Sequence, residues 1–270
     1  MNSARSFLFV PGDRPERFDK ALAAGADCTI LDLEDAVRPE AKEAARSLIR
    51  DWLAAGNRAA VRINPVGTDY HAGDLALAAL PGLSAVLLPK AETAQDCRVL
   101  LGIMASGVPL LPLIETARGL LAAPEIAAVP RVARLLFGSV DFQSDCGIAN
   151  DGDGLRHARS GLVVASAAAG IAGPVDGVTL ALDDLDQLHR DCLAARGLGM
   201  AGKLCIHPRQ VAGVHAGFAP TPTEIDTARR VVEAADATDA KGALRLEGKL
   251  VDQPVIDRAR RVLEQAAAES

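Results

Sequence analysis

The stretch Pro109-Leu-Leu-Pro-Leu-Ile-Glu115-Thr116 is a short apolar run that ends in a single carboxylate. A second stretch, Arg134-Leu-Leu-Phe-Gly-Ser-Val-Asp141-Phe142, has a similar form, with Asp141 soon after the apolar residues. Short apolar runs of this kind predict buried strands of a parallel sheet. The carboxyl ends of such strands line the mouth of the active site in parallel α/β folds. We therefore expect Glu115 and Asp141 to lie at one site.

Similar apolar runs recur along the chain and alternate with helical patterns, of which the clearest has apolar residues on one face between Ala41 and Leu53. The predicted strands are Ser6–Val10, Cys28–Leu33, Ala59–Asn64, Ala85–Pro89, Pro109–Ile114, Arg134–Phe137, Val175–Ala181 and Lys203–Ile206. Repetition of strand and helix predicts a parallel sheet with right-handed crossovers. Eight repeats favour an α/β fold closed into a TIM (β/α)8 barrel, and an open, doubly wound sheet is the alternative.

The pattern changes after the eighth predicted strand. We expect the barrel to span residues 1–217 and a C-terminal helical and hairpin arm to span 218–270. Within the arm, Pro222–Ala237 is predicted as a helix, 242–251 as a hairpin, and Pro254 as the start of a last helix with one apolar face. An apolar face of this kind must be buried, so the arm is predicted to be a lid or an oligomerisation element.

Composition limits the partners of the chain. Its 270 residues carry a net charge of −6 and no run of Lys and Arg, which argues against nucleic acid. No apolar stretch approaches the ~20 residues that span a bilayer, so no membrane partner is expected. The five cysteines are scattered without a C-x-x-C pair, and no secretory signal opens the chain. A reducing, cytoplasmic location follows as an expectation.

Two lone carboxylates at neighbouring strand ends suggest a divalent cation. Mg²⁺ takes one or two carboxylates and leaves its other positions to water and substrate, so Glu115 and Asp141 are candidate Mg²⁺ ligands. The alternative is that each acid caps the helix that follows it.

A third acidic segment is Cys28-Thr-Ile-Leu-Asp32-Leu-Glu34-Asp35. Strand alternation places Asp32 and Glu34 on one face, where buried carboxylates need cationic partners. Arg62, which ends the next predicted strand, is the natural partner. Either the pair is structural, or Glu34 holds Arg62 so that its guanidinium meets an anionic or enolate oxygen.

Three further features leave alternatives open. Lys90 ends the fourth predicted strand and is either a Schiff-base nucleophile or a source of charge balance. His207 precedes a proline and is either a base or a structural residue. The acidic loop Gly147–Gly154, after Asp141, is either a lid or a solvated loop.

Several motifs in order carry a resemblance to a known family. They are Phe9-Val-Pro-Gly-Asp-Arg14-Pro-Glu-Arg-Phe-Asp-Lys20, Leu31-Asp-Leu-Glu34-Asp35-Ala-Val, Val61-Arg62-Ile-Asn64, Leu88-Pro-Lys90-Ala-Glu, Ile114-Glu115-Thr-Ala-Arg-Gly119, Phe137-Gly-Ser-Val-Asp141-Phe, Val175-Asp-Gly177, Gly202-Lys-Leu-Cys-Ile-His207-Pro-Arg-Gln210 and Gly248-Lys-Leu-Val-Asp252-Gln-Pro254. With these motifs the chain resembles the citrate lyase beta-subunit-like family, within the malyl-CoA lyase, citramalyl-CoA lyase and HpcH/HpaI aldolase group.

The resemblance implies a TIM barrel, an assembly built on trimers (a homotrimer or a dimer of trimers), and Mg²⁺ held by Glu115 and Asp141. It further implies that Arg62, beside Glu34 and Asp35, binds the keto-acid or enolate oxygen. Arg14 and Lys20 would contact the phosphates of coenzyme A, and Asp252 would reach the site of a neighbouring subunit. Asp145 and Cys146 are unusual for the family, and Asp145 is either a further metal ligand or a group behind the ligands.

The expected function is a Mg²⁺-dependent carbon–carbon lyase that cleaves or forms a 3-hydroxyacyl-CoA thioester. Malyl-, citramalyl- and citryl-CoA are candidate substrates, with acetyl-CoA and a 2-keto acid as products. The alternatives are a class II aldolase on free hydroxy-keto acids and a partner-dependent subunit without activity of its own. Dependence on the CoA moiety separates the first two.

Overall fold

The computed structural model describes residues 1–237 and 244–267, with the backbone alone at Leu244. The chain divides into two compact units, Met1–Phe218 and Ala219–Ser270. Residues 242–243 of the predicted hairpin lie outside the described residues.

The first unit is built on a curled parallel sheet of seven strands in the order β6-β5-β4-β3-β2-β1-β7. Neighbouring strands in this order pair in parallel throughout. The strands are β1 (Ser6–Pro11), β2 (Cys28–Asp32), β3 (Ala59–Arg62), β4 (Leu83–Leu88), β5 (Leu110–Ile114), β6 (Leu136–Phe137) and β7 (Lys203–Cys205).

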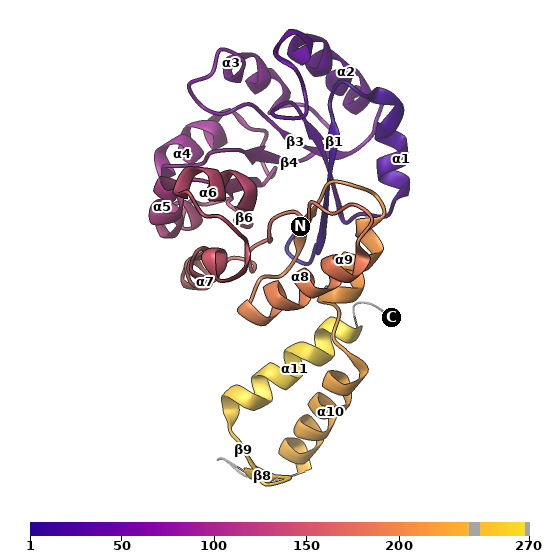
Figure 1. The fold of residues 1–270 in the computed structure, drawn as a ribbon, viewed down its shortest axis with the longest axis vertical. Helices are drawn as coiled ribbons and strands as arrows, with labels where there is room; N and C mark the ends of the chain where they lie inside the picture. The colour runs from indigo at the N-terminus through magenta and orange to yellow at the C-terminus, as the bar shows by residue number, and fades with distance from the viewer. Residues whose placement is uncertain (238–243, 268–270) are drawn as a thin grey trace. The chain divides into compact units, whose positions relative to one another are not determined.

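Helices lie between the strands in sequence and around them in space (Figure 1). They are α1 (Phe18–Ala23), α2 (Lys42–Ala54), α3 (His71–Asp74), α4 (Ala94–Ile103), α5 (Ala117–Ala127), α6 (Ser139–Cys146), α7 (Gly152–Ala169), α8 (Leu185–Leu198) and α9 (Gln210–Phe218). Short 3-10 turns occupy Pro15–Arg17, Pro39–Ala41 and Leu75–Leu77. Among the described residues, no helix is long and apolar enough to cross a membrane.

Capping side chains fix where several of these helices begin. The hydroxyls of Thr93 and Thr116 accept the N–H groups of Asp96 and Gly119 at the starts of α4 and α5. Helix α7 begins at Gly152, so the last part of the predicted loop Gly147–Gly154 is helical. The loop is therefore shorter than the sequence indicated.

Strand alternation divides the apolar side chains of the first unit into two clusters. One cluster packs the strands against the helices and includes Leu31, Val61 and Val86 together with Ile49 of α2. The other cluster lies on the opposite, inner face of the sheet, and most of its members come from strands. Its buried members are Ala4, Phe7, Cys28, Ile30, Ala60, Ala85, Leu87, Leu111, Leu113, Leu136, Val175 and Leu204.

The predicted strand Val175–Ala181 is wrong in its extent. Only Val175 and Asp176 form parallel bridges, to Leu136 of β6 and Lys203 of β7. A Cβ atom on Gly177 would lie 2.1 Å from Oγ of Ser139, so the chain passes close against α6 at this point. Farther along, Thr179 donates to Asp191 of α8. These contacts lead the chain from the sheet toward α8 and explain why pairing stops after two residues.

A buried ion network joins this two-residue link to its surroundings. Asp176 accepts from Lys203 at 3.0 Å and from Nε of Arg159 at 2.6 Å. Arg159 also pairs with Asp151, the residue before α7. Burial by itself raises the pKa of Asp176, but the charges of Lys203 and Arg159 outweigh it and hold that pKa below its usual value.

The second unit is a helical pair with a small hairpin. Helices α10 (Pro222–Ala237) and α11 (Gln253–Ala267) flank the antiparallel strands β8 (Leu244–Leu246) and β9 (Lys249–Val251). Ala228 and Val231 of α10 bury against Val251, Ile256 and Ala259. Part of the apolar face predicted for the last helix is therefore covered within this unit.

We predict that Asp176→Asn destabilises the protein by about 3 kcal/mol at pH 7, because Lys203 then stays buried with its main partner lost. Asp176 has a lowered pKa, so its contribution is present above the usual carboxyl pKa of ~4 and is lost as pH falls through the native value. The difference in free energy of unfolding between the wild type and the variant therefore shrinks in acid. Urea denaturation at pH 7 and at lower pH measures both effects.

The matched control is Asp183→Asn, which removes an exposed pair with Arg209. It is expected to change stability by less than about 1 kcal/mol. Equal effects of the two substitutions at pH 7 would contradict the structural role of Asp176.

Candidate functional site

The candidate site lies at the carboxyl ends of neighbouring strands, on the inner face of the sheet. The alternation that buries Cys28 and Ile30 on that face carries on to Asp32 at the end of β2. The same alternation carries from Ala60 to Arg62 on β3. On β5 it carries from Leu113 to Glu115, just past the end of the strand. On the inner face of the sheet, charged side chains therefore follow the apolar ones toward the carboxyl ends of the strands.

Arg62 is held by two carboxylates. Its Nε and Nη2 each donate to Asp32 at 2.6 Å, in a two-point contact. Its Nη1 lies 2.7 Å from Glu34 and 3.8 Å from Asp35. Burial lowers the pKa of Arg62, but the charges of Asp32 and Glu34 raise it above its usual range. The guanidinium is therefore a permanent, fixed cation that also lies over the ring of Phe9, 4.7 Å from its centroid.

The turn after β2 is supported from behind by Lys42 of α2. Its Nζ donates to the carbonyl oxygens of Leu33 and Glu34 and to Oδ1 of Asn64, at 2.7, 2.9 and 2.7 Å. Asp32 accepts the N–H of Glu34 at 2.9 Å. These contacts hold Glu34 in one place although it lies beyond the end of the strand.

Lys90 contacts two of the carboxylates of the site. Its Nζ donates to Oε1 of Glu34 at 3.0 Å, and its backbone N–H donates to Oε1 of Glu115 at 2.7 Å. Burial lowers the pKa of the Lys90 ammonium, but Glu34 outweighs this and raises it above the usual value. A lysine that forms an imine needs a lowered pKa. The geometry therefore favours the charge-balance interpretation over a Schiff-base nucleophile.

Glu115 is a buried carboxylate in acidic surroundings. Burial, followed by the charge of Glu34, raises its pKa to about 8; the N–H of Lys90 opposes the rise and Asp141 adds to it. Burial also raises the pKa of Glu34, against the effect of Arg62. Burial is therefore the main factor that disfavours the ionised form of both carboxyl groups.

A cavity of about 330 Å³ opens between these groups. Glu115 and Asp141 both line it, together with Asp32, Asp35 and Arg62. Asp141 lies in the first turn of α6 and is partly exposed. The rest of the wall is mostly apolar and consists of Phe9, Ala36, Leu113, Phe137, Gly138, Ser139, Val140, Val178, Leu204 and Ile206.

The donor set fits a hard divalent cation. Glu115 and Asp141 supply two carboxylates on one cavity, and a cation there would stabilise the ionised form of Glu115, which burial and the charge of Glu34 disfavour. Among residues 1–237 and 244–267, no cluster of three or more His, Cys, Asp or Glu side chains forms a metal site. Two protein carboxylates are nevertheless what Mg²⁺ commonly uses, with water and substrate completing its shell.

Other predicted site residues lie apart from this cavity wall. Arg14 follows β1 at the same end of the sheet and is exposed, as is Lys20 on α1. Asp252 belongs to the second unit, where its carboxylate accepts the N–H of Val255 at the start of α11. The contacts of Arg14, Lys20 and Asp252 with a ligand stay predictions.

Asp145 contacts the start of α5, the helix that follows Glu115. Its carboxylate accepts the N–H of Ala117, at 2.7 Å, where α5 begins two residues after Glu115. This contact ties Asp145 to the start of α5, and both of its predicted roles at the metal stay predictions, while Cys146 is exposed at the end of α6. His207 accepts the N–H of Arg209 at Nδ1, a local contact typical of a structural residue.

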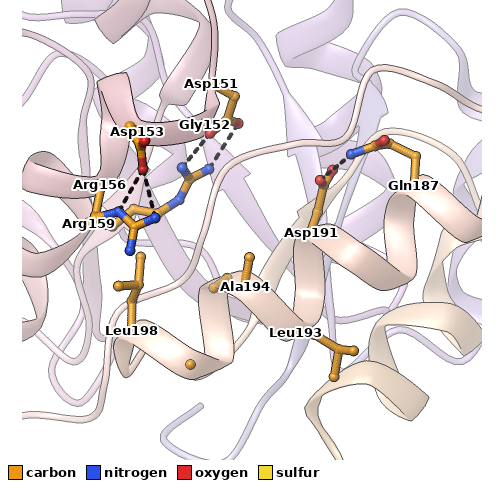
Figure 2. A pocket seen from close by; sticks show the side chains of 12 residues that line it. Asp151, Gly152, Asp153, Arg156, Arg159, Gln187, Asp191, Leu193, Ala194 and Leu198 are labelled. Atoms are coloured by element: carbon orange, nitrogen blue, oxygen red, sulfur yellow. Dashed lines mark hydrogen bonds and ion pairs between the residues drawn. The ribbon is translucent and has the colours of Figure 1, made fainter.

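Sequence reasoning missed the two-point contact of Asp32 with Arg62, the N–H that Lys90 offers to Glu115, and a second cavity. That cavity, of about 620 Å³, lies between α7 and α8 and is larger than the first. Figure 2 shows its charged walls paired among themselves, Arg159 with Asp151 and Arg156 with Asp153. Gln187 likewise donates to Asp191. No pattern of charged residues in the sequence indicated this cavity.

Comparison with known proteins gives consistent relatives. The family model for HpcH/HpaI aldolase/citrate lyase matches residues 5–208. A citrate lyase subunit beta-like protein of Deinococcus radiodurans is 37% identical, over 97% of this chain and 97% of that protein. A (3S)-malyl-CoA thioesterase of Cereibacter sphaeroides is 35% identical, over 98% of this chain and 95% of that protein.

Solved structures agree with the sequence relatives. The crystal structure of CitE from Mycobacterium tuberculosis, in complex with magnesium, acetoacetate and coenzyme A, is 37% identical to this chain. The match covers 99% of this chain and 100% of the CitE chain, with a TM-score of 0.87. The chain therefore belongs to the HpcH/HpaI aldolase/citrate lyase family and is an enzyme.

Proposed function

We propose that this protein is a Mg²⁺-dependent carbon–carbon lyase acting on a 3-hydroxyacyl-CoA thioester of the malyl, citramalyl or citryl type. The observation that carries the proposal is the pairing of Glu115 and Asp141 with the fixed cation Arg62 on one cavity. The related CitE that binds magnesium, acetoacetate and coenzyme A supports the same ligand classes. We also infer that the sheet acts as a closed (β/α)8 barrel, with Val175 and Asp176 in place of one strand.

Glu115 and Asp141 would hold the Mg²⁺ ion at the cavity. When bound, the ion would act as a Lewis acid toward the substrate carboxylate and the neighbouring oxygen. Cleavage breaks the bond between the carbinol carbon and the thioester α-carbon, so that the hydroxyl loses its proton and the thioester leaves as an enolate. The products are acetyl-CoA, after protonation of that enolate, and a 2-keto acid.

Arg62 would stabilise the negative charge that develops on an oxygen. Its contacts with Asp32 and Glu34 are made before substrate binds, so the guanidinium need not reorganise during the reaction. A guanidinium has five N–H donors, and those not used by the carboxylates are available to substrate. Asp35, exposed beside Arg62, would help to set the charge at this wall.

The remaining parts of the proposal follow the family resemblance. Arg14 and Lys20 would bind the coenzyme A phosphates, which suits two exposed cations. Asp252 of a neighbouring copy would move the proton in a homotrimer or dimer of trimers, with the second unit as the arm that carries it. A cytoplasmic location is proposed with these roles.

Thioester hydrolysis is a second candidate, because a relative at 35% identity is a (3S)-malyl-CoA thioesterase. Hydrolysis gives a free hydroxy acid and coenzyme A, whereas cleavage gives acetyl-CoA and a keto acid. Product identity therefore separates the two reactions.

The deciding experiment is a mass-spectrometric turnover screen of the purified protein with Mg²⁺, and with EDTA as control. The panel holds malyl-, citramalyl- and citryl-CoA and free hydroxy-keto acids. Release of acetyl-CoA and a keto acid, abolished by EDTA, is expected. Cleavage of the free acids alone would favour the aldolase, and no reaction on either would favour a partner-dependent subunit.

We predict that Glu115→Gln lowers turnover at least ~100-fold, because it removes one of two metal carboxylates while keeping the side-chain shape. Calorimetric titration with Mg²⁺ alone gives a readout that does not need the substrate, and weaker binding is expected. Unchanged Mg²⁺ affinity in a folded variant would refute the metal site.

Arg62→Lys tests the fixed cation. Lysine keeps the charge but cannot make the two-point contact with Asp32. We expect kcat to fall by about 10²-fold with a smaller change in Mg²⁺ affinity, since the lost interaction acts on the developing oxyanion. Steady-state kinetics beside the Mg²⁺ titration measures the two effects, and a loss confined to Mg²⁺ binding would refute this role.

Gly138→Ala tests the crowding around Glu115. An added Cβ would lie 2.5 Å from Cβ and from Oε2 of Glu115, although the backbone φ of −85° suits alanine. Displacement of the carboxylate is expected to weaken Mg²⁺ binding about tenfold. Gly102→Ala on α4, where nothing lies within 4 Å of the new Cβ, is the control and should bind Mg²⁺ as the wild type does.

A further inference from the structure

Lys90 has an unusual backbone for its residue type. It follows β4 with a φ of 46°, in the left-handed region that glycine favours. A side chain with a Cβ is strained there, and such residues persist where the surrounding contacts hold them. The contacts around Lys90 therefore hold it in this conformation.

The conformation turns two successive N–H groups toward β5. The N–H of Lys90 donates to the carboxylate of Glu115 at 2.7 Å, and the N–H of Ala91 donates to the carbonyl of Leu113 at 3.2 Å. In an extended strand, successive N–H groups point in opposite directions. The left-handed backbone of Lys90 instead directs both N–H groups to the same side, one to a carboxylate and one to a backbone carbonyl.

The side chain of Lys90 serves a second carboxylate. Its ammonium contacts one oxygen of Glu34 at 3.0 Å, while the other oxygen of Glu34 lies 2.7 Å from Nη1 of Arg62. Glu34 is thus bridged between two cations. A continuous series of contacts therefore links Glu115 to Arg62 through Lys90 and Glu34.

We propose that Lys90 is a positioning residue that holds Glu115 through its left-handed backbone and Glu34 through its ammonium. It thereby sets the metal-binding carboxylate and the oxyanion-binding Arg62 in one geometry. This inference rests on the proposed function, because it takes Glu115 as a metal ligand and Arg62 as the cation that meets substrate.

Two substitutions separate the backbone role from the ammonium role. Lys90→Gly removes the ammonium but adopts a φ of 46° without strain, so the N–H stays directed at Glu115. Lys90→Val also removes the ammonium, and its branched Cβ is a poor fit to that φ. Gly56→Val is the matched strain control. Gly56 has a φ of 96° with nothing near its Cβ, and it lies before β3, at the opposite end of the strands.

We expect Lys90→Val to bind Mg²⁺ at least ~10-fold more weakly than Lys90→Gly, by calorimetric titration with Mg²⁺ alone. Gly56→Val should lower Tm while its Mg²⁺ affinity stays that of the wild type. Equal Mg²⁺ affinity in the two Lys90 variants would overturn the backbone role.

The ammonium role is measured by kinetics on the thioester selected in the turnover screen. Lys90→Gly is expected to lower kcat at least ~10-fold with less change in KM, since the alignment of Arg62 acts on the transition state. Lys90→Arg keeps a cation and should restore part of that loss. Equal kcat in Lys90→Gly and the wild type would overturn this role. A keto-acid adduct trapped on Lys90 by borohydride would also overturn it, because it would show that Lys90 forms an imine.

Glu115→Gln, titrated alongside, separates the two levels of inference. Weak Mg²⁺ binding in Glu115→Gln with equal affinities in the two Lys90 variants would refute the backbone role of Lys90 alone. Wild-type Mg²⁺ binding in Glu115→Gln would refute the metal site and, with it, the positioning role.

Discussion

The buried contact between Asp32 and Arg62 is the interaction on which the site depends. It joins the ends of β2 and β3 on the inner face of the sheet, where an unpaired guanidinium would be strongly unfavourable. The same carboxylate accepts N–H groups of Glu34 and Ala36, so it also shapes the turn that carries Glu34. One acidic side chain therefore sets both the position of the cation and the position of the next acid along the chain.

Much of this arrangement could be predicted from the sequence, because strand alternation is a strong local signal. Alternation predicted a common face for Asp32, Glu34 and Arg62, and Arg62 contacts both acids. The strand itself ends at Asp32, so the turn that follows places Glu34. The apolar run before Glu115 likewise predicted where that carboxylate lies. Helix α10 occupies the predicted range Pro222–Ala237, since its apolar spacing and its proline signalled a helix.

Other features depended on tertiary contacts that no local pattern encodes. Alternation did not say which carboxylate would take the two-point contact with Arg62, and Asp32 takes it. The left-handed backbone of Lys90 carries no sequence signal, because lysine rarely adopts it. The apolar run at Val175–Ala181 resembles a strand, yet contacts of Gly177 and Thr179 with α6 and α8 end the pairing after Asp176. Asp145 was placed only by its contact with α5.

Helix α6 carries two acids four residues apart that face different neighbours. Asp141 lines the cavity, and Asp145 caps the first N–H group of α5, close to Glu115 in sequence. Each residue of a helix is rotated by about 100° from the one before it. An insertion or deletion of one residue between the two acids would turn one of them away from its neighbour. The two contacts therefore constrain the number of residues between Asp141 and Asp145 as well as the identity of the two acids.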